Sequence, residues 1–169
     1  MPRHRLVTLL LVGALAFVTG ADLAHARRKK QSVAATINGK HRRWRARKVH
    51  VVLNSGNVTV IATITRPRLH QLVPGLSIAC QLDLAGPFPV TPQFPQLCVL
   101  GYSEFRFARN IPHKLWGGNN FDGSVTVTFD SLVDGKLTGT FRGTLPSEDM
   151  PPGPPAQVDD GTFVIDVGG

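Results

Sequence analysis

The sequence predicts an all-β chain, an antiparallel β-sandwich or small barrel of about seven to eight strands that is preceded by a cleavable signal helix. Three observations lead to this prediction. Apolar and polar residues alternate along much of the chain, and Gly, Asn, Asp and Pro separate the alternating runs at short intervals. No segment after the N-terminal region shows a convincing helical period.

The first 26 residues have the features of a secretory signal peptide. A positively charged start (residues 3–5) precedes an uncharged apolar run (residues 6–18), and Ala24-His25-Ala26 provides a small-x-small cleavage site. A membrane anchor is the alternative, but a spanning helix needs about 20 apolar residues, and the uncharged run ends at Asp22. We therefore expect a secreted or periplasmic protein without a transmembrane segment after cleavage. No cysteine lies near the cleavage site, so no lipid anchor is expected.

Residues 27–34 are expected to form a basic arm, followed by one β domain over residues 35–169. Ten basic residues and no acidic residue lie between positions 27 and 48, whereas residues 49–169 contain seven basic and ten acidic residues. The arm is interpreted either as a solvated segment that aids solubility or as a surface for polyanions. The residues assigned to the polyanion surface are Arg27, Arg28, Lys29, Lys30, Arg42, Arg43 and Arg45.

The first half of the domain contains three short strand patterns. Residues 33–38 are β-prone and end at Asn38-Gly39, a strong turn signal. Residues 47–53 alternate, and residues 58–65 are rich in β-branched side chains. Because only turn residues separate the last two runs, they are expected to form a hairpin.

The clearest alternation runs from Leu76 to Leu84, and a second strand is expected over residues 97–107. A Pro-rich loop, residues 86–95, lies between them. Cys80 and Cys98 are the only cysteines, so an exported chain is expected to hold them in one disulfide, with two buried free thiols as the alternative. This pairing would place the apolar residues of the two strands opposite each other.

The last part of the chain contains three further patterns. Residues 125–129 alternate, with Val125, Val127 and Phe129 separated by threonines. Residues 137–145 show the same alternation of apolar residues and threonines, and residues 162–167 are expected to form the last strand. Glycines interrupt the second of these runs on its inward face, at positions 139 and 143. Such glycines often mark a bulge, a bend or the close approach of another backbone.

Four motifs stand out along the mature chain: GSVTVT at 123–128, KLTGTF at 136–141 and DGTF at 160–163, together with ATINGK at 35–40, which is followed by Trp44. With these motifs the chain resembles a widespread set of uncharacterised bacterial exported or lipoprotein-like β domains. The chain departs from many such proteins because it lacks a lipidation cysteine and contains the Pro-rich loop. The resemblance implies an exported, sandwich-like β domain and implies no activity.

The sequence contains no recognised catalytic signature. G-x-S-x-G, H-E-x-x-H, the P-loop and G-x-G-x-x-G are all absent. No histidine lies at a metal-ligand spacing from another, so we expect no catalytic residues, no metal site and no cofactor. Carboxylates flank the segment MPPGPP and are interpreted as part of a solvated loop, with a calcium site as the alternative. These carboxylates are Glu148, Asp149, Asp159 and Asp160.

The segment 108–120 is the strongest candidate for a binding loop. It gathers cationic, aromatic and amide side chains, which suit glycan or peptide binding. The candidate binding residues are Arg109, His113, Lys114, Trp116, Asn119 and Asn120. In the alternative interpretation, which we prefer, Trp116 packs over one end of the sandwich and the polar residues are solvated.

These observations favour an exported, non-catalytic envelope or extracellular protein, either a structural part or a binding module for a glycan or another surface polymer. Two alternatives stay open. One is a small hydrolase whose site is assembled by the fold, and the other is a polyanion-binding protein that uses the basic N-terminal arm.

Overall fold

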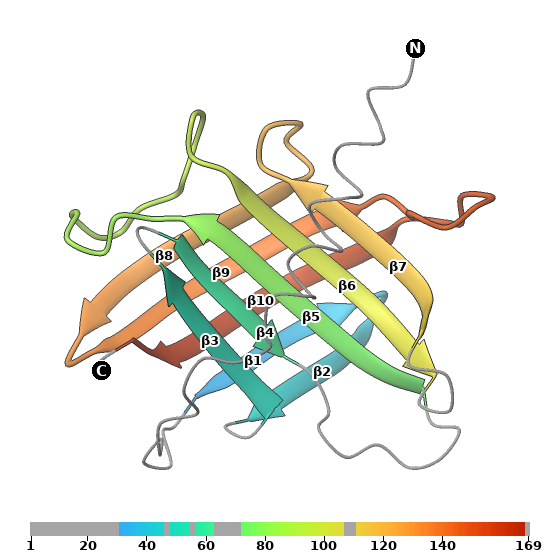
Figure 1. Cartoon of the computed structure of the whole chain (residues 1–169), viewed down its shortest axis with the longest axis horizontal. Helices are drawn as coiled ribbons and strands as arrows, with labels where there is room; N and C mark the ends of the chain where they lie inside the picture. The colour runs from blue at the N-terminus through green and yellow to red at the C-terminus, as the bar shows by residue number, and fades with distance from the viewer. Residues whose placement is uncertain (1–30, 46–47, 55–56, 63–71, 107–110, 168–169) are drawn as a thin grey trace.

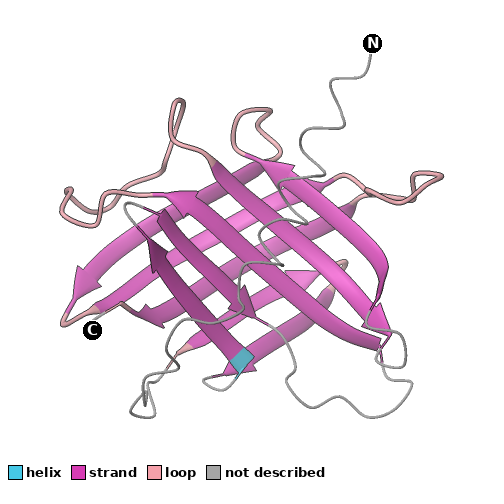
Figure 2. Ribbon diagram, in the orientation of Figure 1, coloured by secondary structure: helices cyan, strands magenta, loops and turns pink. Residues whose placement is uncertain are grey.

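Two antiparallel five-stranded sheets face each other in the computed structural model of the chain, which describes residues 31–45, 48–54, 57–62, 72–106 and 111–167 (Figures 1 and 2). The strands of one sheet cross those of the other at a steep angle (Figure 1). The sheets do not close into a barrel, so the predicted all-β fold is adopted as a sandwich.

Each sheet has a simple strand order. Sheet A contains, in spatial order, β2 (Lys40–Arg45), β1 (Ser32–Ile37), β10 (Ala156–Asp166), β9 (Lys136–Leu145) and β8 (Val125–Val133). Sheet B contains β3 (Val49–Asn54), β4 (Asn57–Ala62), β5 (Leu72–Gln81), β6 (Cys98–Arg106) and β7 (Ile111–Asn119). Consecutive strands pair except at β2–β3 and β7–β8, where the chain passes from one sheet to the other. The first strand, β1, also pairs with the last, β10.

The core fills the space between the two sheets. Alternation along each strand turns every second side chain inward, and the buried residues of all ten strands form one cluster. The largest fully buried side chains are Trp44, Phe129, Phe163, Ile78, Leu100, Leu137, Leu145 and Ile165. This continuity is what one hydrophobic core in a single sandwich requires.

Several predicted elements are confirmed. The expected hairpin is present as β3 and β4. In β5 and β6, Cys80 lies opposite Cys98, and Ile78 lies opposite Leu100, as the disulfide pairing predicted. The described residues form ten strands, more than the seven or eight predicted, because β2 and β7 were not recognised as strands.

The last strand is also longer than predicted. β10 begins at Ala156, six positions before the predicted start at Thr162, and its pairing with β9 is interrupted by a bulge between Val158 and Gly161. Asp160 adopts a φ of 49° within this bulge. A bulge of this kind bends a strand without ending it, which explains why the alternation in the sequence is broken although the strand continues.

Gly139 and Gly143 mark close approaches between β9 and β8, as expected. A Cβ atom added at Gly139 would collide with the Phe163 ring and with the carbonyl oxygen of Thr128. At Gly143 an added Cβ would lie 2.6 Å from the carbonyl oxygen of Ser124. Both positions therefore have no room for a side chain.

The proposed signal peptide and residues 27–30 of the basic arm lie outside the described residues. β1 begins at Ser32, so the last three residues of the segment 27–34 belong to sheet A. Within the part of the chain that the structure describes, no helix has the length and apolar character needed to cross a membrane.

Candidate functional site

Most of the segment 108–120 is a strand rather than the predicted loop. Ile111–Asn119 forms β7, which lies at an edge of sheet B and pairs with β6. The loop prediction was wrong because this pairing outweighs the low strand propensity of Pro112, Gly117 and Gly118. An edge strand tolerates such residues better than a central one does.

Trp116 lies between the two sheets. Its side chain is 6% exposed, and its ring stacks on Tyr102 with the centroids 5.3 Å apart. The indole N–H donates a hydrogen bond to the carbonyl oxygen of Pro154 at 2.9 Å. The packing interpretation of Trp116 is therefore confirmed, and its ring offers no face for a ligand to stack on.

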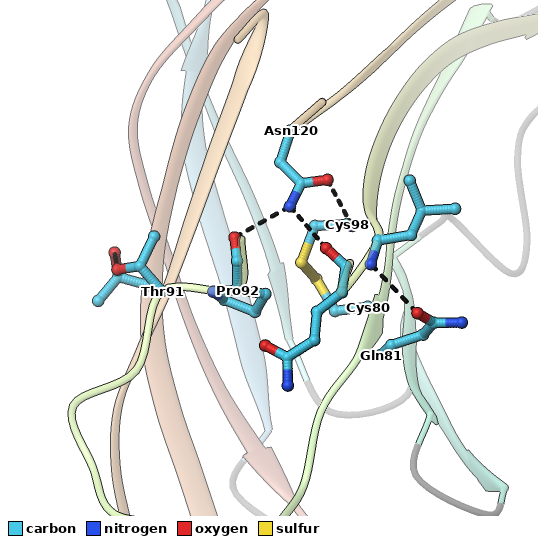
Figure 3. The surroundings of a disulfide bond; sticks show 9 residues. Cys80, Gln81, Thr91, Pro92, Cys98 and Asn120 are labelled. Atoms are coloured by element: carbon cyan, nitrogen blue, oxygen red, sulfur yellow. Dashed lines mark hydrogen bonds between the residues drawn. A yellow bond between two sulfur atoms is a disulfide. The ribbon is translucent and has the colours of Figure 1, made fainter. Parts of the chain in front are cut away.

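Asn120 ties β7 to the Pro-rich loop (Figure 3). Its amide nitrogen donates to the carbonyl oxygens of Pro92 and Gln96, each at 2.9 Å, and its amide oxygen accepts from the backbone N–H of Cys98 at 2.9 Å. These three bonds direct the side chain into the protein, where it holds the loop.

Asn119 organises the turn between β7 and β8. Its side-chain oxygen accepts from the backbone N–H groups of Phe121 and Asp122 at 2.8 and 3.3 Å. Its amide nitrogen donates to the Asp122 carboxylate at 3.3 Å. Like Asn120, this residue has a structural use in the fold.

The three basic candidates of this segment do not form a described cluster with these residues. Lys114 is exposed on β7, opposite Glu104 of β6. His113 belongs to β7, but its side chain lies outside the described part of the structure, as does the whole of Arg109. The segment therefore contributes packing and turn contacts, and the described residues do not assemble it into a ligand site.

The disulfide closes the base of the Pro-rich loop (Figure 3). Beside it, the Gln81 side chain accepts from the backbone N–H of Leu97 at 3.2 Å. Further along the loop, Val90 exchanges two backbone hydrogen bonds with Phe129 of β8, at 2.9 and 2.8 Å. The loop is thus held at its base by sheet B and in its middle by sheet A.

Strand β2 presents a basic surface at the edge of sheet A. Trp44 is the inward residue of the strand, 2% exposed, and its indole N–H donates to the carbonyl oxygen of Pro74 at 3.3 Å. The exposed residues of β2 are Lys40, His41, Arg43 and Arg45. Of the seven residues assigned to polyanion binding, Arg43 and Arg45 are thus exposed together on β2.

A row of aligned residues crosses all five strands on the outer face of sheet A. From β2 to β8 it contains Arg43, Ala34, Thr162, Thr140 and Thr128. The Thr128 hydroxyl is hydrogen-bonded to the Thr91 hydroxyl of the Pro-rich loop at 2.8 Å. The outer face therefore joins an arginine at the sheet edge to a line of hydroxyl groups.

A polar cluster between the sheets, which no sequence motif indicated, involves Arg42, Tyr102 and Glu104. Arg42 has the same orientation along β2 as the buried Trp44, and its Nε atom is buried without a hydrogen-bond partner. The Tyr102 hydroxyl donates to Glu104 at 3.1 Å. Extending the inward alternation of β6 past Tyr102 would have placed Glu104 on the inner face.

The environment of Tyr102 keeps its hydroxyl protonated. Burial raises its pKa, the charge of Glu104 and the hydrogen bond to it raise the pKa further, and the charge of Arg42 lowers it. Tyr102 therefore acts as a hydrogen-bond donor in this cluster and is unsuited to act as a base or a nucleophile.

The carboxyl group of half-buried Glu148 provides a second buried polar atom without a hydrogen-bond partner. Its Oε2 atom makes no hydrogen bond, although the backbone N–H of the same residue donates to the carbonyl oxygen of Leu115 at 2.9 Å. Burial raises the pKa of the Glu148 carboxyl, and the neighbouring Asp149 charge raises it further. Asp149 itself accepts from the backbone N–H of Leu115 at 3.3 Å.

The acidic residues around MPPGPP do not form a metal site in the described structure. Among the residues that the structure describes, no group of three His, Cys, Asp or Glu side chains is arranged to hold a metal ion. Glu148 and Asp149 lie beside β7, whereas Asp159 and Asp160 lie at the bulge in β10.

Comparisons with known proteins give no family for this chain. No family model matches the sequence, and neither a curated protein nor a solved structure matches it.

Proposed function

We propose that this chain is an exported, non-catalytic protein of the cell envelope or extracellular space that binds an anionic glycan or another anionic surface polymer. The observation that carries the proposal is the basic edge strand β2, on which Lys40, His41, Arg43 and Arg45 are exposed. Binding is assigned to β2 and the adjoining outer face of sheet A.

The chemistry of this face suits a polymer with repeated anionic groups. Arg43 and Arg45 are two residues apart on one face of the strand, which corresponds to about 7 Å. Guanidinium groups form bidentate hydrogen bonds with carboxylate, sulfate and phosphate groups. The neighbouring hydroxyl groups of Thr162 and Thr140 can hydrogen-bond to the hydroxyls of a sugar ring.

Two features of the sequence support the proposed location. The N-terminal 26 residues have the features of a cleavable signal peptide. The Cys80–Cys98 disulfide is of a kind that persists in oxidising compartments.

The proposal is tested by measuring how the exported protein binds immobilised heparin and dextran sulfate, with neutral dextran as the reference. Binding should fall steeply with salt because counterions are released from the polymer. The double variant Arg43→Ser/Arg45→Ser should bind about tenfold more weakly. The slope of its log affinity against log salt concentration should also be less steep by about 2. Both side chains are exposed, so the variant should fold normally.

The matched control is Lys114→Ser, which removes an exposed positive charge from β7 of sheet B, and it is compared with the single β2 variant Arg43→Ser. The control should lose much less affinity than the β2 variant. Equal losses, or binding that does not respond to salt, would contradict the assignment to β2. A deletion that tests the arm must stop before Ser32, because residues from Ser32 onward form β1.

A further inference from the structure

Three of the four sheet edges are protected against pairing with another strand. The edge of β8 is paired with Val90 of the Pro-rich loop through two backbone hydrogen bonds. The edge of β7 is bonded to the segment 146–148, through Gly117 N–H to the oxygen of Pro146 and Glu148 N–H to the oxygen of Leu115. The edge of β2 is rich in positive charge, which opposes pairing with another copy of itself.

Among the residues that the structure describes, the remaining edge, that of β3, has none of these protections. Within the described part of the chain, β4 is the only segment that pairs with β3. The strand Val49–Asn54 contains neither proline nor a Lys, Arg, Asp or Glu residue. Val52 is 44% exposed and its neighbour Leu53 is 41% exposed. Successive residues point to opposite faces of a strand, so this edge is open on both faces.

We propose that β3 pairs with the β3 strand of a second copy of this chain, which joins two B sheets into one continuous antiparallel sheet. An edge strand exposes a row of unpaired backbone N–H and C=O groups, and another strand can form hydrogen bonds with all of them. A two-fold axis perpendicular to the sheet makes two copies of β3 antiparallel. With the axis at Val52, this residue meets its own copy, and His50 lies opposite Asn54 of the other copy.

Charge favours a second copy as the occupant of this edge. The outer face of sheet B, next to β3, carries Thr59 and Ile61 on β4 and Ser77 and Ala79 on β5. No like charges therefore meet when the two sheets join through β3, whereas arginines would meet if they joined through β2. One pair of six-residue strands is a small interface, so we expect a dissociation constant of about 10–100 μM.

The test is the oligomeric state of the full exported protein, measured by sedimentation equilibrium from about 1 to 500 μM. The wild-type protein should pass from monomer to dimer over this range. Val52→Lys places two like charges at the axis and should weaken the dimer at least about tenfold. Val133→Lys is the control, because Val133 is 61% exposed at the end of β8 in the other sheet.

A second variant tests the register. Val52→Cys should give a disulfide-linked dimer under mild oxidation, because the same residue meets its copy at the axis, whereas Val133→Cys should stay monomeric. Far-UV circular dichroism and denaturation midpoints verify that each variant is folded. If Val52→Lys does not fold, Leu53→Lys is measured in its place. A wild-type protein that is monomeric at every concentration, or a dimer insensitive to both lysine variants, would overturn the proposal.

Discussion

Trp116 fills the space between the sheets beside Tyr102, and its indole N–H is satisfied by Pro154. Replacing it with alanine leaves a cavity in the core. We expect Trp116→Ala to lower the free energy of unfolding by about 3–5 kcal/mol, measured by chemical denaturation. Phe121→Ala is the control, because Phe121 is 50% exposed, and this change should cost about 1 kcal/mol or less. An unchanged midpoint for Trp116→Ala would contradict the packing role.

Glu148 links stability to pH. Because burial raises its pKa in the folded protein, the folded state holds the proton to a higher pH than the unfolded chain does. Stability should therefore fall as pH rises from the ordinary carboxyl pKa through the raised one. Glu148→Gln should remove this loss, so the variant should be more stable than the wild-type protein at pH 7.

The measurement for Glu148 is the free energy of unfolding of both proteins between pH 4 and pH 8. The difference between variant and wild type should be small at the acid end and should increase toward neutral pH. A difference that does not change with pH would show that the carboxyl group is not the cause.

Among the strands, β9 depends on glycine at its contact with β8 and β10. A methyl group at position 139 has no room, because the Phe163 ring and the Thr128 carbonyl group occupy that space. Gly139→Ala should cost about 1–3 kcal/mol or more through overpacking. Gly153→Ala, where the nearest atom would be 3.4 Å away, serves as the control and should change thermal stability much less. Equal effects of the two changes would exclude the steric explanation.

The strands that the sequence predicts correctly are those with a strong pattern of their own. β5 alternates from Leu76 to Cys80 between a buried face and a partly exposed one, and its partner β6 continues the same register to Tyr102. β2 gives no such signal, because Trp44 is its one buried residue among basic neighbours. An edge strand needs few apolar residues, so its sequence need not show the alternation that identifies a central strand.

The candidate site was less predictable than the fold. The Asn120 amide looked available for a ligand in the sequence, but its partners Pro92 and Gln96 are 28 and 24 residues away in the chain. Arg42 was grouped with Arg43 and Arg45, although alternation turns it to the opposite face, where its Nε atom is buried. Such contacts depend on which strands meet, and composition alone does not contain that information.

For the whole molecule, the Cys80–Cys98 disulfide restricts the unfolded chain more than it shapes the folded one. It spans 18 residues, and Asn120 and the Val90–Phe129 bonds hold the same loop independently. Cys80→Ala/Cys98→Ala should therefore keep the fold and lose about 3 kcal/mol of stability, seen in the denaturation midpoint. Dithiothreitol should shift the wild-type midpoint by a similar amount and leave the double variant unchanged. A wild-type midpoint that ignores reduction would contradict this account.

The pairing of β1 with β10 also determines when the protein can finish folding. The backbone N–H of Gln157 donates to the Asn38 side chain at 2.8 Å across 119 residues of chain. The chain must therefore be synthesised as far as β10 before the β1–β2 hairpin can dock on its neighbour in sheet A. Contacts so distant along the chain form slowly, so we expect the closure of sheet A to be a late step in folding. A chain terminated before Ala156 would leave sheet A as two separate hairpins.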